Sequence, residues 1–201
     1  EQWAQTMANL AAVYGHRILG NRSENIEKTI LACKEALQVR TRTSMPVEWA
    51  QILNNMANAY DRRILGDWAD NIEQAITAYN DALQVFTYAT IPAEWATTMM
   101  NLANAYSHRI QGNRAENIEQ AIAIYNEALQ VRTRATMPIE WAQVMVNLAN
   151  AYCNRICGNR ADSIENAIAT YQEALSVLTI EQLPAEHQQT QLNLGNLLFR
   201  E

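Results

Sequence analysis

The stretch PAEWATTMMNLANAYSHRIQGNRAENIEQAIAIYNEALQVRTRATM, residues 92–137, recurs along the whole 201-residue chain. Its tryptophan, tyrosine and glycine return at a constant step of 46 residues, in the series Trp3, Trp49, Trp95 and Trp141, then Tyr14, Tyr60, Tyr106 and Tyr152, and Gly20, Gly66, Gly112 and Gly158. A period between 20 and 50 residues indicates a solenoid, in which each repeat buries its apolar face only against its neighbours. We therefore expect one array, with repeats at about 1–45, 46–91, 92–137 and 138–183 and a half repeat at 184–201.

Each repeat predicts two helices. The first helix begins at a proline, which suits the first helical position because its missing N–H would be unpaired there anyway, and ends at the glycine; the prolines are Pro46, Pro92, Pro138 and Pro184. The second helix follows a capping residue such as Asn113, with an acid three positions later. Residues spaced by three or four form an apolar stripe on each helix. In the third repeat the stripes are Trp95, Met99, Leu102, Tyr106 and Ile110, then Ile118, Ala121, Ile122, Tyr125, Ala128 and Leu129. The sequence predicts an all-α fold of about nine helices in antiparallel pairs.

The bulk composition excludes several classes of function. A net charge of −6 and a pI near 5.1 argue against a nucleic-acid partner, which would need concentrated Lys and Arg. Every apolar run is too short to predict a membrane span, and no basic-then-apolar signal segment opens the chain. We expect a cytoplasmic protein without a membrane partner.

The three cysteines predict neither a disulfide framework nor a metal site. Cys33 stands where the other repeats have Tyr79, Tyr125 and Tyr171, so it should fill core space. Cys153 and Cys157 are four residues apart and could hold half a metal site, but no matching ligand pair occurs in that repeat. We expect reduced thiols, no metal and no cofactor.

Charge is unevenly distributed along the array. Formal charges sum to +2 over residues 1–45 and to −4 over residues 46–91. This contrast could help repeats to stack or steer a mixed-charge partner. The alternative is a set of scattered, solvated faces.

Both ends of the chain lie inside the repeat pattern. Glu1-Gln2-Trp3 matches the Pro-x-Glu-Trp of later repeats without the proline, and Glu201 lies within the first helix of the fifth repeat. Solenoids usually end in atypical capping repeats. We therefore expect this sequence to be a segment of a longer array.

The residues Asn101-Leu-Ala-Asn-Ala-Tyr106 and Ala121-x-x-x-Tyr125-x-x-Ala128 resemble the tetratricopeptide repeat. Leu102, Ala103, Tyr106, Ala121, Tyr125 and Ala128 fill that family's characteristic places. The usual repeat of the family is about 34 residues long. The longer repeats here are similar to those of large cyanobacterial multidomain proteins and of kinesin light chains. The resemblance implies a right-handed α-solenoid that captures peptides in a concave groove lined by the first helix of each repeat.

The resemblance also implies a set of peptide-binding residues on the first helices. These are a row of asparagines at one repeated position and four flanking residues that vary between repeats: Asn58, Asn104, Asn150 and Asn196, with Asn54, Arg62, His108 and Asn154. The first repeat has Ala12 in place of the asparagine. A carboxamide both donates and accepts hydrogen bonds, so the row could pair with the backbone of any extended peptide. Alternatively, these asparagines tie adjacent helices together or are simply solvated.

Three other repeated series favour structural roles. A second asparagine row, Asn9, Asn55, Asn101, Asn147 and Asn193, should pack between repeats. The arginines Arg17, Arg63, Arg109 and Arg155 lie near helix C-termini, which favour cations, and Glu27, Glu73, Glu119 and Glu165 are candidate partners. The tryptophan series lies on the apolar stripe and should belong to the core.

No catalytic signature occurs in the sequence. A Gly-rich phosphate loop, a Gly-x-Ser-x-Gly elbow and a His-Glu-x-x-His helix are all missing. We expect a non-enzymatic scaffold that binds a protein or peptide partner. The alternative is a structural or regulatory arm of a larger protein, which binds no free peptide and self-associates through its exposed end helices.

Overall fold

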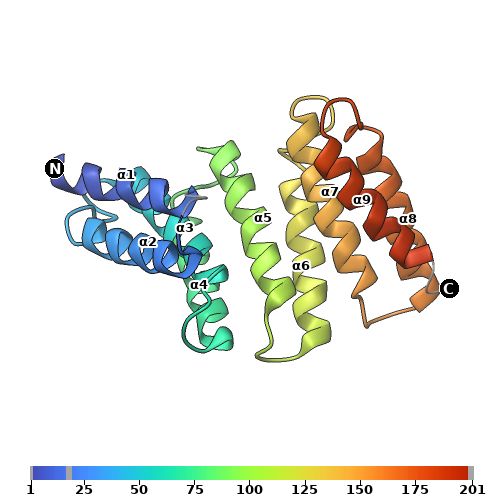
Figure 1. The fold of residues 1–201 in the computed structure, drawn as a ribbon, viewed down its shortest axis with the longest axis horizontal. Coiled ribbons are helices and arrows are strands. Elements are labelled where there is room, and N and C mark those ends of the chain that lie inside the picture. Colours follow the sequence, from blue (N-terminus) through green and yellow to red (C-terminus); the bar gives the residue numbers. More distant parts are fainter. Residues whose placement is uncertain (1, 17–19, 199–201) are drawn as a thin grey trace. The chain divides into compact units, whose positions relative to one another are not determined.

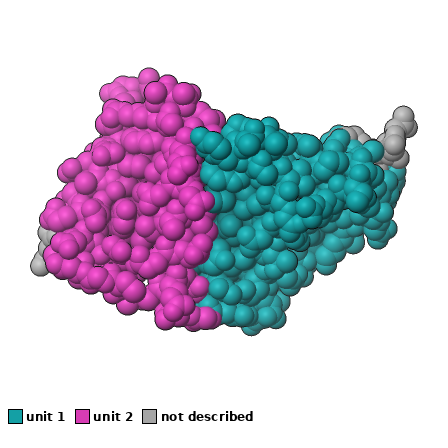
Figure 2. All heavy atoms as spheres, turned by 180° about the vertical axis from the view of Figure 1, so that it is seen from behind, with its two compact units in different colours: residues 1–111 teal, residues 112–201 magenta. Residues whose placement is uncertain are grey.

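The computed structural model describes residues 2–16 and 20–198, and these ranges contain nine α-helices and no strand (Figure 1). The chain divides into two compact units, residues 1–111 and 112–201 (Figure 2). Unit 1 holds α1 (Gln2–His16), α2 (Arg22–Leu37), α3 (Pro46–Asp61), α4 (Trp68–Ala82) and α5 (Pro92–His108). Unit 2 holds α6 (Arg114–Ala128), α7 (Pro138–Cys153), α8 (Arg160–Leu175) and α9 (Pro184–Leu198).

Within each unit, helices that follow one another in the sequence pack together. In unit 1, α1 contacts α2, α2 contacts α3, α3 contacts α4 and α4 contacts α5. In unit 2 the same holds for α6 with α7, α7 with α8 and α8 with α9. The first helices also touch one another, because α3 contacts both α1 and α5. The predicted all-α solenoid of packed helix pairs is confirmed, while its right-handed sense stays a prediction.

The helix ends follow the predicted signals. Proline opens α3, α5, α7 and α9. The side chains of Asn21, Asp67, Asn113 and Asn159 cap α2, α4, α6 and α8 by accepting backbone N–H bonds in their first turns. Gly66 and Gly158 adopt φ values of 82° and 81° between the helices of a pair. A residue with a Cβ would be strained there, so these turns require glycine.

The core confirms most of the predicted stripes and corrects two assignments. Met99, Leu102, Ile118 and Tyr125 are buried. Ile110, however, is 62% exposed, because α5 ends at His108 and the residue lies in the following turn. Of the tryptophans, Trp141 is 9% exposed and belongs to the core, as predicted, but Trp3 is 50% exposed.

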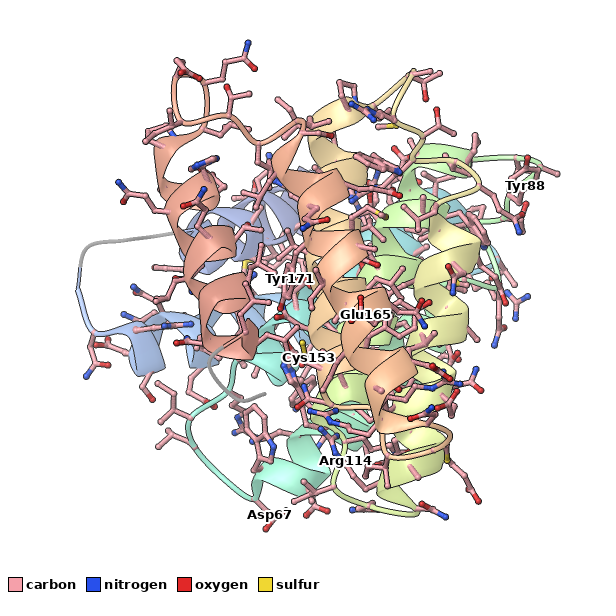
Figure 3. All side chains as sticks on the ribbon, turned by 90° about the vertical axis from the view of Figure 1, so that its right-hand side faces the viewer. Asp67, Tyr88, Arg114, Cys153, Glu165 and Tyr171 are labelled. Carbon is pink, nitrogen blue, oxygen red and sulfur yellow. The ribbon has the colours of Figure 1, made fainter. Side chains whose placement is uncertain are left out.

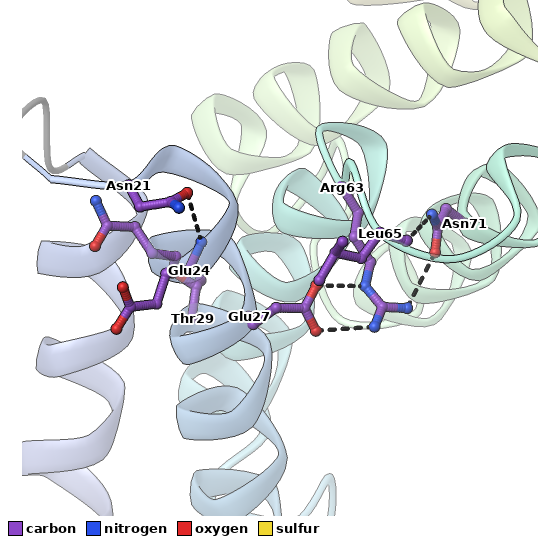
Figure 4. Close-up of polar contacts among 8 residues, drawn as sticks. Asn21, Glu24, Glu27, Thr29, Arg63, Leu65 and Asn71 are labelled. Carbon is purple, nitrogen blue, oxygen red and sulfur yellow. Dashed lines mark hydrogen bonds and ion pairs between the residues drawn. The ribbon is translucent and has the colours of Figure 1, made fainter.

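Successive repeats are joined by bidentate arginine–glutamate pairs. Arg63 donates through Nε and Nη2 to the two carboxylate oxygens of Glu27, at 2.7 and 2.8 Å (Figure 4). Arg109 binds Glu73 at 2.6 and 2.9 Å, and Arg155 binds Glu119 at 2.7 and 3.0 Å. In every pair the arginine lies one or two residues after a first helix, and the glutamate lies on the second helix of the preceding repeat. The predicted structural role is therefore confirmed for these three arginines; Arg17 lies outside the described residues.

The Arg63–Glu27 pair extends into a small, partly buried network of hydrogen bonds. The third guanidinium nitrogen of Arg63, Nη1, donates to Oδ1 of Asn71 at 3.2 Å, and Nδ2 of Asn71 donates to the Leu65 carbonyl at 2.9 Å (Figure 4). The hydrogen bonds from Arg63 lower the pKa of Glu27 below its usual value, and those to Glu27 raise the pKa of Arg63. Both shifts favour the charged forms, so the network holds the α3–α4 turn against α2.

We predict that the contribution of this pair to stability is lost in acid. Because the pKa of Glu27 is lower in the folded chain than in the unfolded chain, the pair stabilises above about pH 4.5 and loses its effect as pH falls below that value. Glu27→Gln should lower the free energy of unfolding at pH 7 by about 1 kcal/mol or less, since the pair is partly exposed. Urea denaturation at pH 7 and pH 3 measures the difference, which should be smaller at pH 3. The exposed Glu127→Gln is the control, and a deficit as large at pH 3 as at pH 7 would contradict the prediction.

Candidate functional site

The predicted asparagine row lies on the first helices of four repeats. Asn58 on α3, Asn104 on α5 and Asn150 on α7 are half-buried, whereas Asn196 on α9 is exposed. The row therefore lies at the boundary between core and solvent in three repeats. Its members can contact both a neighbouring helix and a molecule outside.

A buried tyrosine from the second helix of the same repeat orients two of these amides. The hydroxyl of Tyr79 on α4 donates to Oδ1 of Asn58 at 2.7 Å. The hydroxyl of Tyr171 on α8 donates to Oδ1 of Asn150 in the same way. Burial raises the pKa of both tyrosines well above the usual value, so both hydroxyls stay protonated and able to donate. The amide oxygen is therefore used inside the protein.

Asn150 has a second internal donor, from the following repeat. Nδ2 of Asn193 on α9 donates to Oδ1 of Asn150 at 3.4 Å. Two donors on one oxygen fix the orientation of the amide, because Nδ2 cannot accept a hydrogen bond in its place. Asn193 belongs to the second asparagine row, and this contact gives it the predicted role between repeats. Cys153 also lies near the hydroxyl of Tyr171, with its Sγ 3.9 Å away (Figure 3).

The first repeat changes both members of the asparagine–tyrosine pair together. Each tyrosine follows its asparagine by 21 residues, and the same spacing joins Ala12 to Cys33. Cys33 is fully buried, which raises its thiol pKa to about 12. Replacing both partners of a hydrogen bond with apolar groups costs little, whereas removing one leaves a polar atom unsatisfied. The joint change is therefore the signal by which the sequence could have revealed the pair, although we assigned the tyrosines to core filling alone.

Two cavities beside the first helices of unit 1 are lined by predicted binding residues. A cavity of about 80 Å³, here called cavity A, is lined by residues of α1, α2 and α3, including Asn58 and Arg62. A cavity of about 360 Å³, here called cavity B, is lined by Gln51, Asn54, Asn55, Phe86, Ala93, Glu94 and Thr97. Three of the predicted binding residues, Asn54, Asn58 and Arg62, thus line cavities. Asn54 is the notable one, because its Oδ1 is buried and has no hydrogen-bond partner among the described residues.

The two remaining predicted residues make contacts at the ends of first helices. Nδ1 of His108 lies 3.2 Å from Oδ1 of Asp61, and its ring lies 6.2 Å from that of Trp68. Asn154 is the C-cap residue of α7, and its Nδ2 donates to the Asn150 carbonyl at 3.0 Å. His108 therefore joins the third repeat to the second. Asn154 is exposed, and its hydrogen bond supports the end of α7.

The described residues hold no group of three or more His, Cys, Asp or Glu side chains that could bind a metal ion. The three cysteines are free thiols, and only Cys157 is exposed. None of the described helices is long and apolar enough to cross a membrane.

Residues 95–133 match the family model of the tetratricopeptide repeat. The match begins at Trp95 on α5 and runs through α6, and helix pairs of the same pattern repeat on either side of it. Residues 95–133 thus form a tetratricopeptide repeat, and the repeated helix pairs around them are consistent with that family. No curated protein matches its sequence. Repeats of this family are generally non-enzymatic and typically bind protein partners, so the array suggests a protein–protein interaction scaffold.

We predict that the asparagine–tyrosine pairs can be measured as an energetic coupling. Tyr79→Phe should lower the free energy of unfolding by about 1 kcal/mol, because the acceptor of half-buried Asn58 loses its donor. Combined with Asn58→Ala, which reproduces the apolar pairing of Ala12 and Cys33, the loss should be smaller than the sum of the single losses. Urea denaturation of the two single variants and the double variant measures this coupling.

Tyr88→Phe is the control, since Tyr88 is exposed and its edge-to-face contact with Trp95 needs no hydroxyl. That variant should stay within about 0.5 kcal/mol of the wild type. Strictly additive losses at Tyr79 and Asn58 would show that their hydrogen bond contributes nothing.

Proposed function

We propose that this protein is a non-enzymatic scaffold that binds a peptide segment of a partner protein along the first helices of its repeats. The observation that supports the proposal most directly is the position of Asn54, Asn58 and Arg62, which line cavities on these helices. Cavities next to first helices are where the tetratricopeptide resemblance implies a ligand.

The tyrosines restrict what the asparagine ladder offers to a peptide. Oδ1 of Asn58 and of Asn150 accepts from a buried hydroxyl, so the amide N–H groups remain for the ligand. Within the described residues, Nδ2 of neither side chain has a hydrogen-bond partner. The ladder therefore acts as a row of donors, and its targets are the backbone carbonyl oxygens of the peptide. Backbone recognition of this kind leaves selectivity to the flanking residues, which differ between repeats.

Aspartate substitutions separate binding from folding. Asn58→Asp, Asn104→Asp and Asn150→Asp together remove the N–H donors, and at Asn58 and Asn150 they keep an oxygen for the tyrosine. We expect peptides enriched from a random 12-residue library by the wild-type protein to bind this triple variant at least tenfold more weakly, as measured by fluorescence anisotropy. Each lost donor leaves a carbonyl oxygen of the peptide unpaired.

The control for the added charge is a triple aspartate variant at Asn80, Asn126 and Asn166, which are exposed on second helices. This control should bind as the wild type does. Equal affinity in the two triple variants would contradict the ladder, and enrichment of no peptide at all would contradict the scaffold proposal.

A second candidate function is supported by the exposed apolar stripe on α1. Trp3 and Leu10 are exposed there, whereas the equivalent Trp141 and Leu148 on α7 are buried. A structural arm would use this stripe to associate with another helix of its own kind. Under this hypothesis, the mass measured by light scattering rises with protein concentration, and Trp3→Ser with Leu10→Ser abolishes the rise. A constant monomeric mass up to millimolar concentration would contradict it.

A further inference from the structure

One loop position near the start of each first helix differs in charge between repeats. Successive steps of 46 residues give Arg40, Phe86, Arg132 and Leu178, each of which is buried and lies just before the proline of the next first helix. The acid that follows each proline is constant and gives Glu48, Glu94, Glu140 and Glu186. The chain therefore places an arginine near this acid in some repeats and an apolar side chain in others.

Unit 2 shows how a cation is accommodated at this position. Arg132 is only 6% exposed, and its burial lowers the pKa of the guanidinium. The nearby carboxylate of Glu140 opposes that shift, so it stabilises the buried positive charge. The glutamate at the start of α7 thus favours the charged form of the buried arginine.

The loop before the third repeat has the same glutamate without the cation. Phe86 stands in place of the arginine, is 1% exposed and carries no charge. Glu94 is exposed and forms no ion pair with any described residue. Between them lies cavity B, and none of the residues lining it is basic. The counter-charge is present, and space of about 360 Å³ lies beside it.

A second acceptor in cavity B lacks a donor. Oδ1 of Asn54 is buried there and unpaired among the described residues, which costs free energy unless a donor arrives. The equivalent residues of the other repeats are Ala8, Met100, Val146 and Leu192, so this acceptor is particular to the second repeat. A carboxylate and an orphaned amide oxygen together favour a ligand that is cationic and donates hydrogen bonds.

We propose that cavity B receives the side chain of a lysine or arginine from the bound peptide, an inference that rests on the scaffold function proposed above. The charged group binds Glu94, and it donates to Oδ1 of Asn54 once that amide turns toward the cavity, while the ring of Phe86 contacts the methylene stem. A divalent metal does not fit the cavity, because Glu94 is its only carboxylate. The strongly acidic character of residues 46–91 favours the approach of a basic peptide.

The inference can be tested without a known partner by titrating ¹⁵N-labelled protein with single amino-acid amides. The probes are the Nα-acetyl amides of lysine and arginine, up to 50 mM, and their neutral analogues are those of norleucine and citrulline. We expect saturable shifts of the Asn54 side-chain amide and of the backbone amides of Glu94 and Thr97 with the two cationic probes only. The lysine and arginine titrations show which cation the cavity prefers.

Glu94→Gln should weaken binding of the cationic probes about tenfold, because it keeps the shape of the side chain and removes its charge. Glu186→Gln is the matched control, since Glu186 holds the same place in the fifth repeat and its change should leave the titration unaltered. Equal shifts with neutral and cationic probes, shifts that Glu94→Gln does not reduce, or no saturable shift would each overturn the inference.

A further variant supplies the cation from the chain itself. Phe86→Arg reproduces the residue found at Arg40 and Arg132, and it should block the cationic probes by pairing with Glu94. Circular dichroism checks its fold, and Glu94→Gln, at an exposed site, keeps the test valid if Phe86→Arg does not fold.

Library peptides whose affinity is insensitive to replacement of their Lys and Arg residues would overturn this inference and leave the scaffold function intact. Conversely, the cationic probes could bind cavity B while the triple aspartate variant binds library peptides as tightly as the wild type does. That result would contradict the asparagine ladder and leave this inference intact.

Discussion

The close approach of neighbouring helices is the constraint on which this structure depends. Alanines with no exposed surface recur at four places in the repeat, namely Ala50, Ala96 and Ala142, then Ala57, Ala103 and Ala149, then Ala75, Ala121 and Ala167, and Ala36, Ala82, Ala128 and Ala174. A larger side chain at any of them would push one backbone away from the next. The resulting short separation brings every polar pair within reach. The hydroxyl of Tyr79 can reach Asn58 only because α3 and α4 pack this closely.

The two kinds of polar pair stabilise different contacts within the array. Tyrosine–asparagine bonds join the two helices of one repeat, and arginine–glutamate pairs join one repeat to the preceding one. The first kind is buried and can be exchanged for an apolar pair, as Ala12 and Cys33 show. The second kind is partly exposed and salt-sensitive. Order within a repeat therefore rests on burial, whereas the register between repeats also draws on charge.

Local signals in the sequence predicted most of the fold. Proline at Pro92 and an N-cap at Asn113 act through neighbouring backbone groups, so single-residue reasoning located the helix ends. Contacts between repeats were harder to predict from the sequence. Glu27 and Glu73 are both acidic and could each pair with Arg63, and only the packing of α3 against α2 selects Glu27. The orphaned oxygen of Asn54 and the fixed orientation of Asn150 depend on three-dimensional packing and could not be predicted. The extent of a single array and the binding role of the asparagines stay predictions.

The buried loop position before each first helix alternates between arginine and an apolar residue, and this alternation gives the array a second, longer period. The backbone repeats every 46 residues, but Arg40 and Arg132 are followed by Phe86 and Leu178, so the chemistry beneath the first helices returns only after two repeats. The chemical period is thus twice the structural one. Two adjacent repeats, rather than one, form the smallest segment that contains both kinds of environment. A segment grafted into another array would have to span such a pair to carry its full chemistry.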